Sequence, residues 1–123
     1  MIYGIGSDIV DINRFEKYLD DEKRLSKIYT AYELAGFKKI TNKRRKMEFL
    51  ASRFAVKEAM SKALGVGISK DFSFLDIEVL KDERNKPYIV YKDFITHVTI
   101  SHTDTVAVAF VVLEKGVKED DIR

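Results

Sequence analysis

The stretch FLASRFAVKEAMSKALGVG, residues 49–67, decides the fold of this 123-residue chain. Its apolar residues recur at helical spacing and predict a long helix over roughly 43–64. Two apolar bands lie on roughly opposite sides of that helix: Met47, Leu50, Phe54, Glu58 and Ser61 form one, and Phe49, Val56, Met60 and Ala63 form the other. A helix that is covered on two sides lies at the centre of its fold.

The residues before the long helix predict one strand and short helices. Residues 2–10, IYGIGSDIV, are apolar with two glycines and indicate a strand that ends near Asp8. Asp11 can cap a short helix over 12–19, and residues 20–29 indicate a second helical stretch. The first half of the chain is therefore predicted to be mainly helical.

Capping signals mark the ends of the helices. Thr30 and Glu33 have capping-box spacing, in which each side chain satisfies the other residue's free backbone N–H. Asn42 can cap the long helix. Gly65 supplies the positive-φ exit that a helix C-terminus often takes.

The residues after the long helix change to the two-residue period of strands. Residues 74–82, FLDIEVLKD, alternate apolar and acidic side chains, which predicts a half-buried strand. A turn at 82–87 leads to a shorter strand over 88–91. Residues 97–101 and 106–113 flank HTDT as a hairpin, and its second strand is apolar enough to be buried on both faces.

The composition, with 46% hydrophobic and 34% charged residues, is that of a soluble globular protein. With the patterns above it predicts an α+β fold in a single domain over 1–123, in which a helical first half with one long central helix packs on an antiparallel sheet. Cysteine is absent, which excludes disulfides and thiolate chemistry. The longest apolar run, Val106 to Leu113, is far shorter than the ~20 residues that cross a bilayer. We expect a cytoplasmic protein with no membrane partner.

The formal net charge is only +2, but KKITNKRRK at 38–46 concentrates basic groups in the first half of the chain. One interpretation is a solvated helix face, and another is a docking surface for an acidic partner. A basic module that binds nucleic-acid phosphates is a further alternative. The small net charge and the acidic clusters count against it, so we expect no nucleic acid partner.

Glu58 places a carboxylate inside an apolar stripe, where an unpaired charge would be costly. Lys62 follows at i+4, a spacing that favours an ion pair at the edge of the core. Lys46, Arg53 and Lys57 are expected to form a basic strip along the other flank of Glu58. Spacing alone favours the ion pair as the explanation of Glu58.

Asp8 offers a second carboxylate, directly after GIGS, where glycines let a backbone or a ligand come close. A lone Asp at this place is commonly a turn or a cap. Two carboxylates nevertheless suit Mg²⁺, which keeps waters and takes further oxygens from a bound phosphate. A cation flanked by lysines suits phosphoryl-type transfer, and another Mg²⁺-dependent phosphoryl hydrolase is the alternative enzyme.

Four segments match a known family in order and spacing: GIGSDIVDINR (4–14), FLASRFAVKEAMSKALGVG (49–67), DIEVLKDERNKP (76–87) and VTISHTDTVAVAFVVLE (98–114). Over about residues 2–114 the chain closely resembles the holo-acyl-carrier-protein synthases, which are short bacterial 4'-phosphopantetheinyl transferases. The resemblance implies the 4'-phosphopantetheinyl transferase fold. It also implies an Mg²⁺-dependent enzyme of fatty acid biosynthesis that moves 4'-phosphopantetheine from coenzyme A to a serine of apo acyl carrier protein and leaves adenosine 3',5'-bisphosphate.

The resemblance further implies residue roles. Asp8, Glu58 and Lys62 would be catalytic: Asp8 and Glu58 would ligate Mg²⁺, Lys62 would neutralise the diphosphate, and the serine proton would go to Glu58 or to a metal-held water. The coenzyme A side would comprise Arg53, Lys62, Gly65, Gly67, Ser101, His102 and Thr103. Arg14 and Arg24 would dock the acidic carrier protein. The family is typically a homotrimer with its sites at subunit clefts.

The chain departs from the family pattern at two positions. Asn85 precedes Lys86 and Pro87 where the family usually has glycine. Asparagine tolerates positive φ better than most residues, so we expect the turn to survive. Val106 stands where the family often has an aromatic residue, which leaves a stacking or packing role at this position open.

Overall fold

The structure is a computed structural model that describes residues 1–68 and 72–116. Its elements in chain order are β1 (Ile2–Asp11), η1 (Ile12–Tyr18), α1 (Glu22–Ile28), α2 (Ala31–Lys38), α3 (Lys43–Leu64), η2 (Phe74–Asp76), β2 (Leu80–Lys81), β3 (Pro87–Tyr88), β4 (Phe94–His102) and β5 (Val106–Lys115). The predicted single domain over 1–123 also includes 69–71 and 117–123, which lie outside the described residues. Among the described helices, none combines the length and the apolar character that crossing a membrane requires.

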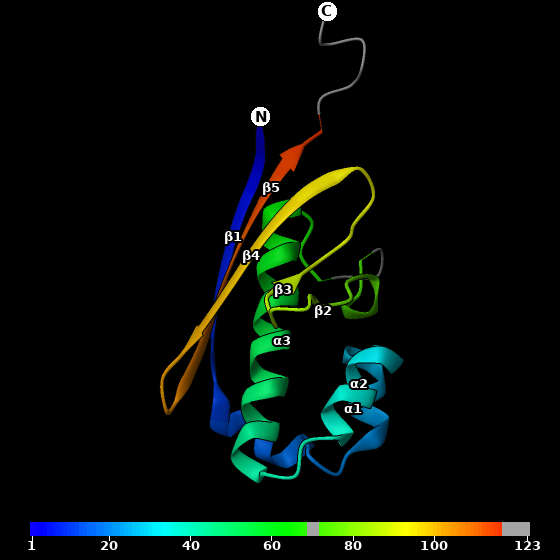
Figure 1. The fold of residues 1–123 in the computed structure, drawn as a ribbon, viewed down its shortest axis with the longest axis vertical. Coiled ribbons are helices and arrows are strands. Elements are labelled where there is room, and N and C mark those ends of the chain that lie inside the picture. Colours follow the sequence, from blue (N-terminus) through cyan, green and yellow to red (C-terminus); the bar gives the residue numbers. More distant parts are fainter. Residues whose placement is uncertain (69–71, 117–123) are drawn as a thin grey trace, which may run out of the picture.

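An antiparallel sheet and the long helix α3 form the centre of the fold. The strand order is β1-β5-β4, so that β5 is the middle strand. Figure 1 shows α3 lying along one face of this sheet, with α1 and α2 on the side of α3 away from it, whereas β3 contacts β4. The predicted α+β class, with one central helix packed on an antiparallel sheet, is confirmed.

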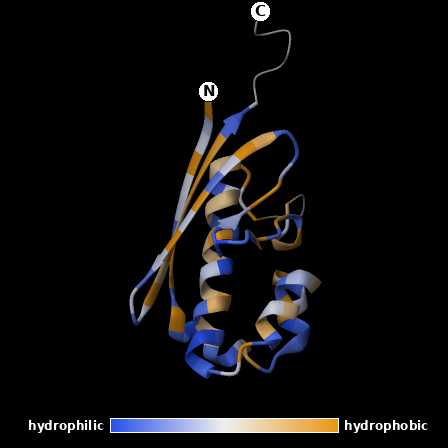
Figure 2. Cartoon of the chain, viewed as in Figure 1, coloured by the Kyte–Doolittle hydropathy of each residue, from blue (hydrophilic) through white to orange (hydrophobic). Residues whose placement is uncertain are grey.

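The caps predicted at Thr30, Asn42 and Gly65 lie at the ends of α2 and α3. Asn42 accepts a hydrogen bond from the backbone N–H of Arg45 at 3.0 Å, and Gly65 leaves α3 at φ 80°. Thr30 and Glu33 form the full capping box of α2. Figure 2 shows that the first turn of α3 is hydrophilic, whereas hydrophobic and hydrophilic segments alternate along its later turns.

Two glycines of β1 bring the sheet onto the backbone of α3. A Cβ atom on Gly4 would lie 1.9 Å from the carbonyl oxygen of Ala63, and one on Gly6 would lie 1.9 Å from that of Ala59. Two residues of a strand and four residues of a helix both advance by about 6 Å, so the two backbones stay in step. The next residue on this face of β1 is Asp8.

The predicted start of the chain needs two corrections. The strand does not end near Asp8 but continues to Asp11, because β1 stays paired with β5, including Asp8 with Ala109. The helix expected over 12–19 is the 3₁₀ helix η1, which ends at Tyr18, and the Asp11 side chain makes no capping hydrogen bond. The helical stretch expected over 20–29 is the shorter α1.

The strand expected over 74–82 is wrong for most of its length. Residues 74–76 form the 3₁₀ turn η2, and only Leu80 and Lys81 pair with another strand. Ile77 and Val79 are buried, as the alternation requires, but Leu75, which the alternation places on the same face, is 45% exposed. However, side chains of α2 and α3, rather than a neighbouring strand, hold the backbone of this segment. The strand expected over 88–91 is likewise limited to Pro87–Tyr88.

The hairpin after residue 93 has its turn where it was expected, but β5 is not buried on both faces. Its inner side chains, Ala107, Ala109, Val111 and Leu113, are fully buried. On the opposite face Phe110 is 50% exposed. The strand register pairs Phe110 with Ser7 and Thr99, and the exposed Ile5 and Ile9 lie on either side of Ser7 on the same face of β1. We call this surface the outer sheet face; its exposed apolar residues are Ile5, Ile9, Ile95 and Phe110.

Candidate active site

The crossing of β1 and α3 brings Asp8, Lys62 and Glu58 together. Lys62 Nζ lies 3.2 Å from Asp8 Oδ1 and donates to the carbonyl oxygen of Ser7 at 3.0 Å. The Asp8 side chain is only 15% exposed. These contacts join residues more than fifty positions apart, and they depend on the close approach of β1 to α3.

Glu58 is half-buried beside this ion pair. Burial raises the pKa of the Glu58 carboxyl, and the negative charge of Asp8 raises it further, while the positive charges of Lys62 and Arg14 act in the opposite direction. The ion pair between Glu58 and Lys62, which spacing alone favoured, does not form. Among the described residues Lys62 pairs with Asp8 instead, because β1 places a carboxylate that helical spacing cannot reveal.

The carboxylates of Asp8 and Glu58 fit a divalent cation. Asp8 Oδ2 is buried and has no hydrogen-bond partner, and an unpartnered buried oxygen is costly. Burial is the main cause of the raised pKa of Glu58, and the negative charge of Asp8 adds to it, so a cation between the two carboxylates would be favourable. Within residues 1–68 and 72–116, no group of three or more His, Cys, Asp or Glu side chains could hold a metal. Such a sparse donor set suits Mg²⁺, which commonly keeps several waters.

A second cluster of polar groups lies on a different side of α3. A cavity of about 310 Å³, which we call the basic cavity, is lined among others by Arg45, Arg53, Lys81, Asn85 and His102. Glu48 also lines it, but that carboxylate pairs with Arg44 at 3.4 Å. Several cations around one cavity are typical of an anion-binding site.

Arg53 is the most buried cation of the basic cavity, at 7% exposure. Its guanidinium lies 3.9 Å from the ring centroid of Phe49, and its Nε has no hydrogen-bond partner. Burial lowers the pKa of Arg53. Burial also lowers the pKa of Lys81, and the charges of Arg53 and Arg45 lower it further. These like charges repel each other, and a bound anion would relieve that repulsion.

Sequence reasoning missed Arg45 and Lys81. Arg45, Phe49 and Arg53 stand at i, i+4 and i+8 on α3, a spacing that puts them on one face and could have revealed Arg45. Lys81 reaches the cavity only through the β2–β3 hairpin, so no local pattern could have revealed it.

The predicted basic strip of Lys46, Arg53 and Lys57 does not exist as a surface. The Lys57 side chain is fully buried, and Lys46 lies over the ring of Phe37 at 5.0 Å. The basic segment 38–46 is likewise spread over several environments: Lys43 pairs with Glu16 at 2.7 Å, whereas other side chains line separate cavities.

The structure separates the predicted cluster of Ser101, His102 and Thr103. His102 lines the basic cavity, whereas Ser101, one residue earlier on β4, faces the opposite side of the sheet. The Thr103 hydroxyl accepts hydrogen bonds from the backbone N–H groups of Thr105 and Val106 and so belongs to the hairpin turn. Only His102 of this cluster joins Arg53.

Both departures from the family pattern have a local structural account. Asn85 adopts φ 63°, so the β2–β3 turn survives as predicted. Val106 is half-buried at the start of β5, where it pairs with Asp11 of β1. Gly67, like Gly65, has positive φ, at 67°.

The two arginines predicted to dock the carrier protein lie on η1 and α1, and only Arg14 is shown to lie near the carboxylates. The Arg14 guanidinium lies 5.0 Å from the ring centroid of Phe54, and its charge reaches Glu58. Arg24 lies 5.2 Å from the ring of Tyr18 and 4.0 Å from Asp21. Arg14 therefore borders the candidate site directly.

Comparison with known proteins identifies the family. The sequence model of the 4'-phosphopantetheinyl transferase superfamily matches residues 4–111. The chain belongs to the 4'-phosphopantetheinyl transferase superfamily. Within this superfamily, a holo-[acyl-carrier-protein] synthase of Staphylococcus aureus (strain Newman) is 49% identical over 117 residues, which are 94% of this chain and 98% of the relative. One of Staphylococcus carnosus (strain TM300) is 47% identical over 116 residues, 94% and 99% of the two chains.

A solved 4'-phosphopantetheinyl transferase superfamily structure has the same fold. The holo-(acyl-carrier-protein) synthase of Bacillus anthracis str. Ames, in complex with CoA (3',5'-ADP), superposes with a TM-score of 0.87 at 50% identity. The superposition covers 94% of this chain and 99% of the other. The family resemblance seen in the sequence, and the fold that it implied, are confirmed.

Proposed function

We propose that this chain transfers 4'-phosphopantetheine from coenzyme A to a serine of apo acyl carrier protein, in fatty acid biosynthesis. The observation that carries the proposal is the convergence of Asp8, Glu58 and Lys62 at the β1–α3 crossing. It is supported by relatives named holo-[acyl-carrier-protein] synthase at nearly half identity over 94% of the chain. The serine oxygen forms a bond to the phosphorus that carries pantetheine, and the bond from that phosphorus to adenosine 3',5'-bisphosphate breaks.

Lys62 and Glu58 supply the groups that this reaction needs from the chain. The Lys62 ammonium, 53% exposed, is available to neutralise the diphosphate as negative charge grows on the leaving phosphate. The Glu58 carboxylate, half-buried beside Asp8, would accept the proton of the serine hydroxyl, either directly or through a water held with Mg²⁺. Mg²⁺, held by Asp8 and Glu58, would supply positive charge to the diphosphate oxygens.

Coenzyme A would contact two groups of residues, which lie on different sides of α3 in one chain. We call the basic cavity the coenzyme A half-site and the group of Asp8, Glu58 and Lys62 the carboxylate half-site. Glu58 and Arg53 are five residues apart, about 140° around the helix axis. The basic cavity with Arg53 and His102, now extended by Arg45 and Lys81, suits the phosphates of coenzyme A. The Gly65–Gly67 loop and Lys62 belong to the other half. Ser101 and Thr103 stay in this proposal as residues of the coenzyme A side, with Ser101 on the outer sheet face and the Thr103 hydroxyl at the hairpin turn.

The separation of the half-sites supports assembly into a homotrimer with sites at subunit clefts. The outer sheet face offers the surface for it, since Ile5 is 65% and Ile9 is 66% exposed. Exposed apolar patches of this kind are typical of protein interfaces. Each site would then combine the carboxylates of one subunit with the basic cavity of the next.

The remaining parts of the proposal concern the carrier protein and the cell. Arg14 and Arg24 dock the acidic carrier protein beside Glu58, and the enzyme acts in the cytoplasm. Residues 1–123 form one domain. The proximity of Arg14 to Glu58 supports the docking role.

The deciding experiment is an intact-mass assay. The protein is mixed with apo acyl carrier protein, coenzyme A and Mg²⁺, and the carrier should gain one phosphopantetheine. Asp8→Ala and Glu58→Ala should abolish transfer while circular dichroism stays unchanged, and a chelator should stop the wild type. No mass gain at high enzyme, or phosphate release from simple esters without a carrier, would refute the transferase in favour of a hydrolase.

A further inference from the structure

The most buried charges of the described chain form an ion pair next to the candidate site. Lys57 Nζ lies 2.7 Å from Glu33 Oε1, and both side chains have 0% exposure. Burial lowers the pKa of Lys57, and the charge of Glu33 opposes that shift. A buried ion pair costs several kcal/mol of desolvation per ion and adds little net stability. We therefore ask which parts of the backbone the ion pair holds in place.

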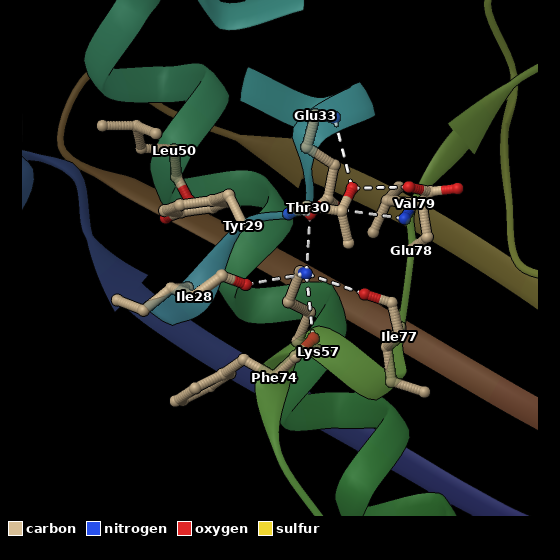
Figure 3. A network of polar contacts seen from close by, with 10 residues as sticks. All are labelled: Ile28, Tyr29, Thr30, Glu33, Leu50, Lys57, Phe74, Ile77, Glu78 and Val79. Atoms are coloured by element: carbon tan, nitrogen blue, oxygen red, sulfur yellow. Dashed lines mark hydrogen bonds and ion pairs between the residues drawn. The ribbon is translucent and has the colours of Figure 1, made fainter. Parts of the chain in front are cut away.

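Lys57 ties two separate parts of the backbone to α3 (Figure 3). Besides Glu33, its ammonium donates to the carbonyl oxygens of Ile28 at 2.9 Å, Phe74 at 3.0 Å and Ile77 at 2.7 Å. An ammonium has only three hydrogens, so these four acceptors saturate it. The end of α1 and the segment 74–77 are thereby tied to one atom.

Glu33 completes the arrangement from α2. Its Oε1 also accepts from the backbone N–H of Thr30 at 2.8 Å, and its Oε2 accepts from that of Val79 at 2.9 Å. The Thr30 hydroxyl in turn contacts the Glu78 carboxylate at 2.5 Å. Segment 74–79 has little regular structure of its own, so the buried pair is its main polar attachment.

This segment leads straight into the basic cavity. Val79 is followed by β2, whose Lys81 lines that cavity with Arg53. Glu33 and Val79 themselves line the adjoining cavity, which shares both of those cations. The distance of the β2–β3 hairpin from Arg53 is therefore set through the backbone that Lys57 and Glu33 hold.

We propose that the Lys57–Glu33 pair is a positioning element for the coenzyme A half-site, holding Lys81 and the β2–β3 hairpin at the distance from Arg53 that the phosphates require. Because Lys57 has no exposed surface, it cannot touch the substrate and acts only through the backbone that it binds. The proposal rests on coenzyme A being the ligand. It predicts that loss of the pair weakens coenzyme A binding more than carrier-protein use.

The test is calorimetric binding of coenzyme A to the wild type and to Glu33→Gln/Lys57→Met, a double variant that leaves no unpaired charge. Binding is measured well below the unfolding temperature of each protein. We expect the Kd to rise about ten-fold, as for loss of a charged hydrogen bond. The KM for the carrier protein should not change, and the Val79 amide should exchange its hydrogen faster.

Two control variants separate positioning from general destabilisation. Tyr29→Phe removes a buried hydrogen bond to the Leu50 carbonyl oxygen, 2.7 Å long, on the same helix, and keeps the ring beside Lys57. Leu113→Ala opens a cavity in β5 and costs about 2–5 kcal/mol. Neither should change the Kd for coenzyme A.

An unchanged Kd in the double variant, or the same rise in Leu113→Ala, would overturn the positioning role. If the double variant does not fold, Glu33→Gln alone decides: the Kd should rise about three-fold, and an unchanged value refutes the role. A wild type that binds no coenzyme A would instead refute the proposed function, and the two failures are thereby distinguished.

Discussion

Gly6 of β1 and Ala59 of α3 lie so close that a Cβ atom on Gly6 would stand 1.9 Å from the Ala59 carbonyl oxygen. No side chain separates the sheet from the helix at this crossing, so backbone contact alone sets their distance. Asp8 follows two residues later on the same strand face. The position of Asp8 relative to Lys62 and Glu58 therefore depends on a hydrogen atom in place of a methyl group.

Gly6→Ala should destabilise the protein and reduce transfer together. The added methyl group meets backbone atoms, which cannot rotate away, so we expect a loss of about 3 kcal/mol in the free energy of unfolding. Urea unfolding and the transfer assay measure the two effects. The control is Gly36→Ala in α2, where the new Cβ would meet only the Phe49 ring at 3.6 Å, and a gain of about 0.5–1 kcal/mol is expected. If the Gly6→Ala protein is as stable as the wild type, β1 and α3 do not approach each other as closely as the structure shows.

Lys81→Gln should stabilise the free protein slightly and weaken coenzyme A binding. Burial, Arg53 and Arg45 lower the pKa of Lys81, so the folded state binds its proton less tightly than the unfolded chain. The wild type therefore gains stability relative to Lys81→Gln as pH rises toward the ordinary lysine value of 10.5. Thermal unfolding of both proteins between neutral and alkaline pH measures this difference. A constant difference would show that Lys81 is not repelled by its neighbours.

Arg14→Glu and Arg24→Glu should each raise the KM for the carrier protein, because charge reversal removes attraction to an acidic partner. Added salt should weaken the wild type in the same sense. Steady-state kinetics at two ionic strengths measure both effects, with Lys38→Glu at the end of α2 as the matched charge reversal. If neither the charge reversals nor added salt changes the KM for the carrier protein, Arg14 and Arg24 do not dock it.

If the chain assembles as proposed, Phe110→Glu should dissociate the proposed homotrimer and abolish transfer. The carboxylate would lie in the middle of the outer sheet face, where burial against another subunit would leave it unpaired at a cost of several kcal/mol. Sedimentation should give a monomer with the wild-type circular dichroism spectrum. An active monomer would show that one chain holds a complete site, and a stable trimer would exclude this face as the interface.

The sequence predicted the fold best where a structure depends on neighbours along the chain. The limits of α3 followed from Asn42 and Gly65, and the capping box of α2 followed from Thr30 and Glu33. The segment 74–82 failed for the opposite reason. Its alternation correctly predicted that Ile77 and Val79 are buried, but the partners that hold its backbone are Lys57 and Glu33, which local periodicity cannot reveal.

The sequence likewise predicted some features of the candidate site and not others. The residues themselves determined which side chains could do chemistry, and the match of four segments to a family indicated Asp8, Glu58 and Lys62 as a set. From the spacing along α3, however, we predicted an ion pair between Glu58 and Lys62, because only partners that are close in the sequence can be recognised without a structure. In the structure Lys62 pairs with Asp8, and Lys57, which was predicted to lie in a basic strip, is buried in the core.

The sequence by itself determined α3, the caps at Thr30, Asn42 and Gly65, the hairpin and the family, because these depend on residue type and on spacings of two to four positions. Only the tertiary structure decided which cations are buried, which face of β5 stays exposed, and that Arg53 lines the basic cavity whereas Glu58 lies beside Asp8 and Lys62. Those outcomes depend on contacts between residues dozens of positions apart. There, the close approach of backbones and the desolvation of charges outweigh any local preference.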